Sequence, residues 1–101
     1  MAQYENIMPD EIEKQLKDKK LSIIDVREHD EVARGKIPGA RHIPLGELQA
    51  RLHEIEKDQE HIMVCHSGAR SSMASDFLHR QGFKVKNMIG GMMNWRGKVE
   101  G

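Results

Sequence analysis

The only cysteine of the chain stands where an apolar run gives way to small and polar residues. The run His61-Ile-Met-Val-Cys65-His-Ser-Gly-Ala-Arg70-Ser-Ser predicts a strand that passes directly into a helix. The free N–H groups of a helix N-terminus carry roughly half a positive charge and stabilise an anion beside them. Thiols placed there have pKa values of about 3.5 to 7.5, against about 8.5 for a free thiol. We therefore expect Cys65 to be a nucleophile.

The loop that follows Cys65 has the composition of an anion cradle. Four residues separate Cys65 from Arg70, and Gly68 and Ala69 among them leave the backbone uncovered. Successive inward N–H groups form an anion-binding nest, and a guanidinium adds positive charge without acting as a proton donor near neutral pH. The C-x-x-x-x-R spacing thus predicts a pocket for one anionic group on sulfur.

Several residues near this loop have a structural explanation beside a functional one. A cysteine that ends an apolar run is more often a small buried hydrophobe, and here the glycine, the arginine and the helix start argue against that interpretation. His66 could move protons or bind an acceptor, but a solvent-facing loop histidine explains it equally well, so we assign its side chain no catalytic role. Trp95 could wall the pocket or simply pack.

No metal or cofactor is expected. The chain's six histidines show no spacing typical of a ligand set with Cys65. They are His29, His42, His53, His61, His66 and His79. A single cysteine cannot form an internal disulfide, so redox chemistry would need an external thiol or would end at a modified cysteine such as a persulfide.

Short apolar runs alternate with amphipathic segments along the chain. We expect extended segments at residues 21–26, 41–43, 61–64 and 83–89, and helices at 8–19, 28–34, 44–55, 70–80 and 92–95. The alternation predicts an α/β fold, in which a mostly parallel central sheet carries helices on both faces.

Local signals add detail to these elements. Leucines and an isoleucine at helical spacing predict an amphipathic helix at 44–55, and Met73, Phe77 and Leu78 should turn inward from the helix at 70–80. Gly82 stands where a left-handed cap would end that helix. Gly90-Gly91 permits a sharp turn with close backbone approach.

Three predicted strands end beside residues that could do chemistry or support it. Asp25-Val-Arg27, Cys65 and Gly90-Gly91 each follow a strand. Ligands of open α/β sheets bind beyond the carboxyl ends of the strands. These segments should converge at one edge of the sheet.

Length and composition limit the possible partners. The 101 residues fit one domain, 1–101, with 38% hydrophobic and 32% charged residues. Sixteen basic residues balance sixteen acidic ones, so we expect neither nucleic acid nor a membrane as partner. The N-terminal residues lack the features of a signal peptide, and no run approaches the roughly 20 apolar residues of a membrane span. We expect a cytoplasmic monomer, with a dimer through an apolar helix face left open.

Three motifs in order resemble those of single-domain rhodaneses, which are sulfurtransferases of the rhodanese-like superfamily. The first comprises Asp25-Val-Arg-Glu28, Gly35-Lys-Ile-Pro-Gly-Ala40 and His42-Ile-Pro44, the second is Cys65-His-Ser-Gly-Ala-Arg70-Ser71, and the third is Gly90-Gly-Met-Met-Asn-Trp95. The resemblance covers residues 25–95 and implies one rhodanese-like domain.

This resemblance also implies a reaction. The Cys65 thiolate would take the outer sulfur of a donor, such as thiosulfate or a low-molecular-weight persulfide, and the resulting persulfide would pass it to a thiol or cyanide-like acceptor, which could be a protein thiol. The loop would bind the substrate sulfur through residues His66, Ser67, Gly68, Ala69, Arg70 and Ser71. Asp25 and Arg27 would form a supporting ion pair.

Two other functions remain open at this point. Inactive members of the superfamily bind partner proteins, so a non-catalytic or sulfur-relay module is one alternative, although the cysteine and the arginine are present here. Phosphatases and arsenate reductases of related fold are the other. Their loop has five residues between Cys and Arg, and the four found here should exclude a phosphoryl group.

Overall fold

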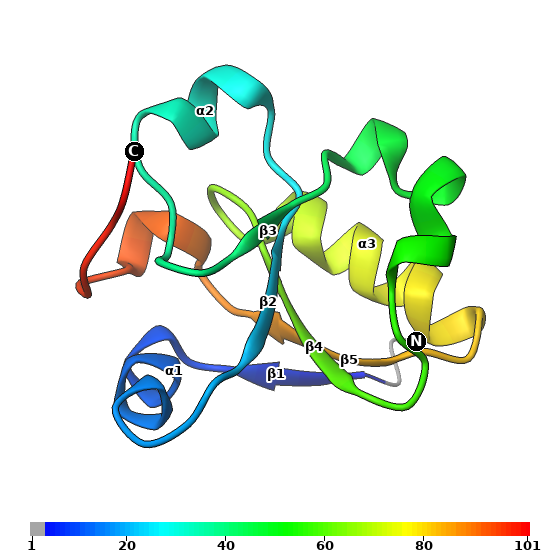
Figure 1. The fold of residues 1–101 in the computed structure, drawn as a ribbon, viewed down its shortest axis with the longest axis horizontal. Coiled ribbons are helices and arrows are strands. Elements are labelled where there is room, and N and C mark those ends of the chain that lie inside the picture. Colours follow the sequence, from blue (N-terminus) through cyan, green and yellow to red (C-terminus); the bar gives the residue numbers. More distant parts are fainter. Residues whose placement is uncertain (1–3) are drawn as a thin grey trace.

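A wholly parallel sheet of five strands forms the centre of the protein in a computed structural model, which describes residues 4–101 (Figure 1). The strands are β1 (Glu5–Ile7), β2 (Ser22–Asp25), β3 (Arg41–His42), β4 (Glu60–Val64) and β5 (Lys84–Met88). They lie in the order β1-β5-β4-β2-β3, and every neighbouring pair is parallel. The α/β class and the parallel sheet are therefore confirmed.

The edge strand β1 is the one strand that the sequence did not predict. It has three residues, of which only Ile7 is buried, and it pairs with β5 through the register Ile7↔Met88. A strand this short has no measurable hydrophobic period, so only its pairing with β5 defines it.

Helices cover both faces of the sheet, as predicted. They are α1 (Pro9–Leu16), α2 (His29–Ala33) and α3 (Ala69–Arg80), and Figure 1 shows α1 and α3 on opposite sides. Ile12 of α1 packs in one apolar cluster with Ile23 and Met88. Leu78 of α3 packs in another with Met63. Within residues 4–101, no helix is long and apolar enough to cross a membrane.

The amphipathic helix expected at 44–55 is not a single α-helix. The segment forms two 3₁₀ helices, η1 (Leu45–Glu47) and η2 (Gln49–Glu54), and Arg51 has a non-helical backbone at φ −112° and ψ 19°. Gly46 in the first turn is a poor helix former, and the turns close by i→i+3 bonds, including Leu48 N–H to Leu45 C=O at 3.2 Å. The spacing of the apolar residues correctly predicted a helical segment, but it did not distinguish 3₁₀ helices from an α-helix.

Helix α3 begins one residue earlier than expected and presents a different inward face. Met73 was expected inward and is 64% exposed, so that prediction is wrong. The buried positions are Ser71, Ala74, Ser75 and Leu78. Small side chains let the helix approach the sheet closely, which a count of large apolar residues cannot show.

The predicted cap of α3 is confirmed. Gly82 has φ 93°, and its N–H donates to His79 C=O at 3.1 Å. Phe83 N–H donates to Leu78 C=O at 3.0 Å, so the backbone closes in the pattern of a Schellman motif. The cap directs the chain into β5.

Candidate active site

The predicted convergence at one sheet edge is confirmed. Asp25 at the end of β2 lies in register with Val64 at the end of β4, and Met63 pairs with Asn87 near the end of β5. After β5, Met92 N–H donates to Cys65 C=O at 2.8 Å. Segments far apart in the chain therefore meet around the cysteine.

Cys65 is fully buried, and its sulfur is hydrogen-bonded. The residue belongs to the apolar cluster on the α3 face, so in its burial it matches the small buried hydrophobe that the sequence analysis argued against. Its Sγ, however, accepts a hydrogen bond from Gly68 N–H at 3.0 Å. Gly68 has φ 101° and is the residue that turns the loop into α3. The sulfur thus lies inside the loop, at the N-terminus of a helix.

The surroundings of Cys65 favour its thiolate. Burial raises the pKa of the Cys65 thiol, but the stabilisation of the charged sulfur by the Ser71 hydroxyl and by the amides of Ser71, Gly68 and Ser67 outweighs burial, so the pKa lies below its ordinary value. Hydrogen bonds donated to the anionic form of an acidic group favour that form and so lower its pKa. The site therefore holds more thiolate near neutral pH than a free cysteine would.

Ser71 supplies the site with a buried hydroxyl. The residue is fully buried, and its Oγ has no hydrogen-bond partner among residues 4–101. Because an unpaired buried hydroxyl is costly, such a group is expected where a charge or ligand will use it. A negative charge on the neighbouring Cys65 sulfur meets that need.

Gly90 and Gly91 press against the loop from the far side, as predicted. A Cβ atom on Gly91 would lie 2.4 Å from the carbonyl oxygen of His66, and one on Gly68 would lie 3.2 Å from the Gly90 nitrogen. Met93 N–H also donates to His66 C=O at 3.0 Å, from the 3₁₀ helix η3 (Gly91–Asn94). The loop therefore has a rigid backbone support.

Arg70 extends from the loop toward α2. Its guanidinium donates two hydrogen bonds to the carboxylate of Glu31, at 2.7 and 2.8 Å. The bond from Arg70 lowers the pKa of Glu31 from 4.5 to about 2. Glu31, together with a Cys65 thiolate, raises the pKa of Arg70. The arginine thus links the loop to α2.

Glu31 was missed by the sequence analysis. Its Oε1 also accepts a hydrogen bond from Glu28 N–H at 2.9 Å, which completes a capping box at the start of α2. The spacing of Glu28 and Glu31 is a readable sign of that cap. Nothing in the sequence indicates that the same carboxylate also binds Arg70.

The ion pair expected from Asp25 and Arg27 is present and buried. Arg27 Nε donates to Asp25 Oδ1 at 3.0 Å, and its Nη2 donates to Oδ2 at 2.8 Å. The same Nη2 also donates to Gly35 C=O at 2.8 Å. The pair fixes the segment after α2 beside the sheet.

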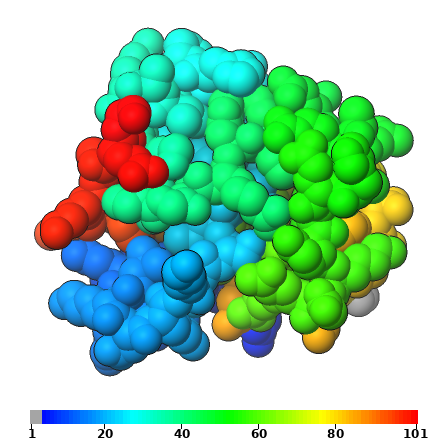
Figure 2. Space-filling view, in the orientation of Figure 1, coloured from blue at the N-terminus to red at the C-terminus, as the bar shows by residue number. Residues whose placement is uncertain are grey.

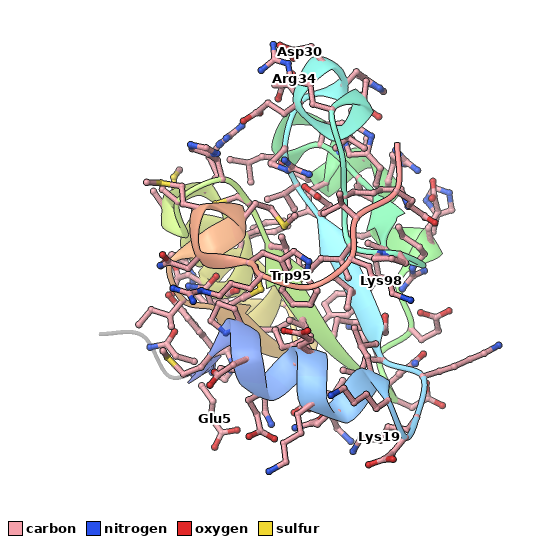
Figure 3. All side chains as sticks on the ribbon, turned by 90° about the vertical axis from the view of Figure 1, so that its left-hand side faces the viewer. Glu5, Lys19, Asp30, Arg34, Trp95 and Lys98 are labelled. Atoms are coloured by element: carbon pink, nitrogen blue, oxygen red, sulfur yellow. The ribbon has the colours of Figure 1, made fainter. Side chains whose placement is uncertain are left out.

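The remaining candidate residues lie at the surface. His66, Ser67 and Ala69 are exposed. Trp95 is partly buried and packs against the cluster on the α1 face, and its indole N–H donates to Lys98 C=O at 3.0 Å. Figure 3 shows Trp95 and Lys98 between the levels of α1 and α2. Among residues 4–101, no three His, Cys, Asp or Glu side chains gather as a metal site would require.

Comparison with known proteins identifies what this arrangement is similar to. The family model described as a rhodanese-like domain matches residues 8–98. The putative sulfurtransferase YtwF of Bacillus subtilis is 45% identical over 83 residues, which make up 82% of this chain and 81% of YtwF. The putative sulfur carrier protein YrkF of the same organism is 48% identical over 84 residues, which make up 82% of this chain and only 45% of YrkF. The chain thus spans less than half of that relative.

A solved structure agrees with these matches. The crystal structure of a rhodanese-like domain protein from Staphylococcus aureus superposes with a TM-score of 0.90 at 33% identity. The superposition covers 95% of this chain and 96% of that one. The whole fold described above therefore has a solved counterpart.

Proposed function

Since the chain belongs to the rhodanese-like domain family, we propose that it is a sulfurtransferase that carries a sulfane sulfur on Cys65. A general sulfur-transfer role agrees with relatives named as a putative sulfurtransferase and a putative sulfur carrier. The observation that carries the assignment to Cys65 is the hydrogen bond from Gly68 N–H to its Sγ at 3.0 Å. It places the sulfur inside an amide loop that stabilises negative charge.

The reaction proceeds in two displacements. The Cys65 thiolate attacks the outer sulfur of thiosulfate, a new S–S bond forms, the S–S bond of the donor breaks, and sulfite leaves with the bonding electron pair. An acceptor nucleophile then attacks the terminal persulfide sulfur and releases the Cys65 thiolate; with cyanide the product is thiocyanate. Both enzyme forms are anionic on sulfur, so one set of N–H donors serves both.

The orientation of Arg70 supports sulfur over phosphorus chemistry. A phosphatase loop needs its arginine to bind phosphoryl oxygens, which suits a bidentate guanidinium. Here both terminal nitrogens of Arg70 bind Glu31. Together with the four-residue spacing, this leaves a loop suited to a single sulfur atom.

Steady-state turnover tests the proposal. Wild-type protein should form thiocyanate from thiosulfate and cyanide, and Cys65→Ser should not, because the variant lacks the thiolate. An aryl phosphate should release no phosphate with either protein. Equal thiocyanate formation by wild type and Cys65→Ser would overturn the assignment.

A relay to a protein thiol is the second candidate. The relative YrkF is named a putative sulfur carrier protein, and this chain has one cysteine, so a persulfide on Cys65 has no second thiol within the chain to receive it. A reduced protein thiol, such as that of thioredoxin, serves as the probe acceptor. Transfer to this thiol faster than to free cysteine at the same concentration supports the relay, and equal rates argue against it.

A further inference from the structure

A cleft of about 420 Å³ opens beside the Cys65 loop. One side consists of α2 and the two residues that follow it, the second of the loop and η3, and the third of the C-terminal segment. The lining residues used below are Glu31, Arg34, Gly35, His66, Met92 and Val99. No role for this cleft follows from the chemistry described so far.

Two lining residues connect the cleft to the loop that surrounds Cys65. His66 follows Cys65 in the chain, and Met92 N–H donates to Cys65 C=O at 2.8 Å, so both lining residues are attached to the loop. A donor whose outer sulfur enters the cradle must place the rest of its body beside the loop. The cleft volume lies within the range of small-molecule sites, about 300 to 1,000 Å³, and far exceeds what a small inorganic anion fills.

The third side is a strap formed by residues 98–101. Lys36 and Glu100 exchange two backbone hydrogen bonds of 2.8 Å, and Lys36 Nζ binds Glu100 Oε2 at 2.6 Å. Gly39 N–H donates to the same carboxylate at 3.2 Å. Figures 1 and 2 show this C-terminal segment lying against the segment that follows α2. The strap is thus fixed at several points.

Val99 is the apolar part of the strap. A Cβ atom on Gly35 would lie 3.2 Å from Val99 Cγ2, so the valine packs on bare backbone. Even so, Val99 is 54% exposed and lines the cleft with Met92.

Arg34 is the cation of the cleft with the weakest internal partner. Glu31 is paired with Arg70, and Arg27 is paired with Asp25. Arg34 lies 3.6 Å from Asp30, and both side chains are more than 70% exposed, which is a weak pair in water. Figure 3 shows these two residues together at the outer end of α2. A ligand carboxylate can replace Asp30 at low cost.

We propose that this cleft binds the organic body of a low-molecular-weight persulfide that bears a carboxylate, with its carbon chain against Val99 and its carboxylate beside Arg34. The inference rests on the proposed sulfur transfer at Cys65. In the transfer step the Cys65 thiolate attacks the outer sulfur of R–S–SH, a new S–S bond forms at Cys65, and the S–S bond between the inner and outer sulfurs of the donor breaks. The organic thiolate leaves with the electron pair and is protonated by water.

A comparison of two sulfur donors tests whether the cleft binds the organic part of the donor. The kcat/KM for glutathione persulfide, relative to that for thiosulfate, is measured in wild type, Val99→Trp and Arg34→Gln. Filling the cleft in Val99→Trp should lower this ratio about tenfold, as expected for a blocked apolar contact. Arg34→Gln should lower it about threefold through KM, and should have no such effect with cysteamine persulfide, which lacks a carboxylate.

Matched controls lie outside the cleft. Arg80→Gln removes an arginine that is also paired with an aspartate at i,i+4, Asp76, on the exposed surface of α3. Lys84→Trp places an indole at the amino end of β5, the opposite end of the sheet from Cys65. Both should leave the donor ratio at the wild-type value. Val99→Ala introduces no steric clash and should lower the donor ratio modestly. It therefore tests the same contact even if Val99→Trp does not fold.

The outcomes separate the two proposals. If thiosulfate loads Cys65 but the donor ratio stays unchanged in the cleft variants, the cleft proposal is wrong and sulfur transfer stands. If the controls lower the ratio as much as the cleft variants do, the cleft proposal is also wrong. If neither donor transfers sulfur to the wild type, both proposals fail together.

Discussion

A titratable side chain is buried at each end of β4, but only at the carboxyl end does a nearby hydrogen-bond donor lack a partner. At the amino end His61 is fully buried, its Nε2–H donates to Glu56 C=O at 2.6 Å, and its Nδ1 pairs with the Ser22 hydroxyl at 2.6 Å. At the carboxyl end the buried Cys65 accepts a hydrogen bond from Gly68 N–H, and the nearby Ser71 hydroxyl has no hydrogen-bond partner among residues 4–101.

This difference separates a structural group from a reactive one. Both ring nitrogens of His61 are satisfied, so the residue contributes to the fold and has nothing left to offer a ligand. Around Cys65 the donors exceed what a neutral thiol can accept, so the site gains most when the sulfur is charged.

The largest effect is expected from Cys65→Ser. A hydroxyl of similar size keeps the packing but cannot supply a thiolate, so thiocyanate formation should fall to background. Because the fold does not depend on the charge, the urea midpoint should stay close to that of wild type. Retained turnover would show that the sulfur is carried elsewhere.

Gly91→Ala should damage the carboxyl end without touching a reacting group. The new Cβ would lie 2.4 Å from His66 C=O at φ 63°, so the backbone must shift and the loop with it. We expect kcat/KM to fall by at least about tenfold. Gly39→Ala is the matched control, since Gly39 also has positive φ (82°) but a Cβ added there would meet no atom within 4 Å. Equal losses in both variants would contradict this support role.

His61→Ala should produce the opposite pattern at the amino end. It removes a buried ring and leaves the Glu56 carbonyl and the Ser22 hydroxyl without partners, which should cost about 2–4 kcal/mol in the free energy of unfolding. Urea denaturation measures the loss. Activity per folded molecule should remain at the wild-type level, and a specific loss of kcat would refute the purely structural role.

Ser71→Ala should move the pH profile. The hydroxyl lowers the pKa of Cys65, so its removal should raise that pKa and shift the acidic limb of kcat/KM to higher pH. The rate should drop severalfold below the Cys65 pKa and recover at alkaline pH. Ser72→Ala, one residue along α3 and not fully buried, serves as control. An unchanged acidic limb would mean that the hydroxyl does not stabilise the thiolate.

Glu31→Gln should have the smallest effect, and one that depends on pH. The pKa of Glu31 is lowered to about 2 by Arg70, so its pair stabilises the fold above pH 4.5 and loses that contribution as pH falls toward 2. A partly exposed pair should contribute about 1 kcal/mol at neutral pH. The difference in unfolding free energy between wild type and variant should vanish on acidification; a constant difference would contradict the ion-pair assignment.

Local signals predicted the parts of this molecule that local physics determines. The apolar runs gave β2, β4 and β5 within about two residues, and Gly82, Gly90 and Gly91 adopt the conformations that only glycine takes easily. The position of Cys65 between a strand and a helix followed from the same signals.

Long-range contacts determine the rest. The strand β1 is defined by its pairing with the edge of β5. Met73 is exposed because small residues of α3 face the sheet in its place. Glu31 lies 39 positions from Arg70, and no local pattern links them. The strap residue Val99 likewise acquires its place through long-range contacts, namely its own packing on Gly35 and the pairing of the neighbouring Glu100 with Lys36.

A single loading reaction tests the central claim most directly. Reduced protein is mixed with thiosulfate, freed from excess donor, and analysed by intact mass and by peptide mapping without reductant. The account predicts a gain of one sulfur atom on the peptide that contains Cys65, lost again when cyanide is added. An unchanged mass, or a sulfur that cyanide cannot remove, would contradict a persulfide carried in this loop.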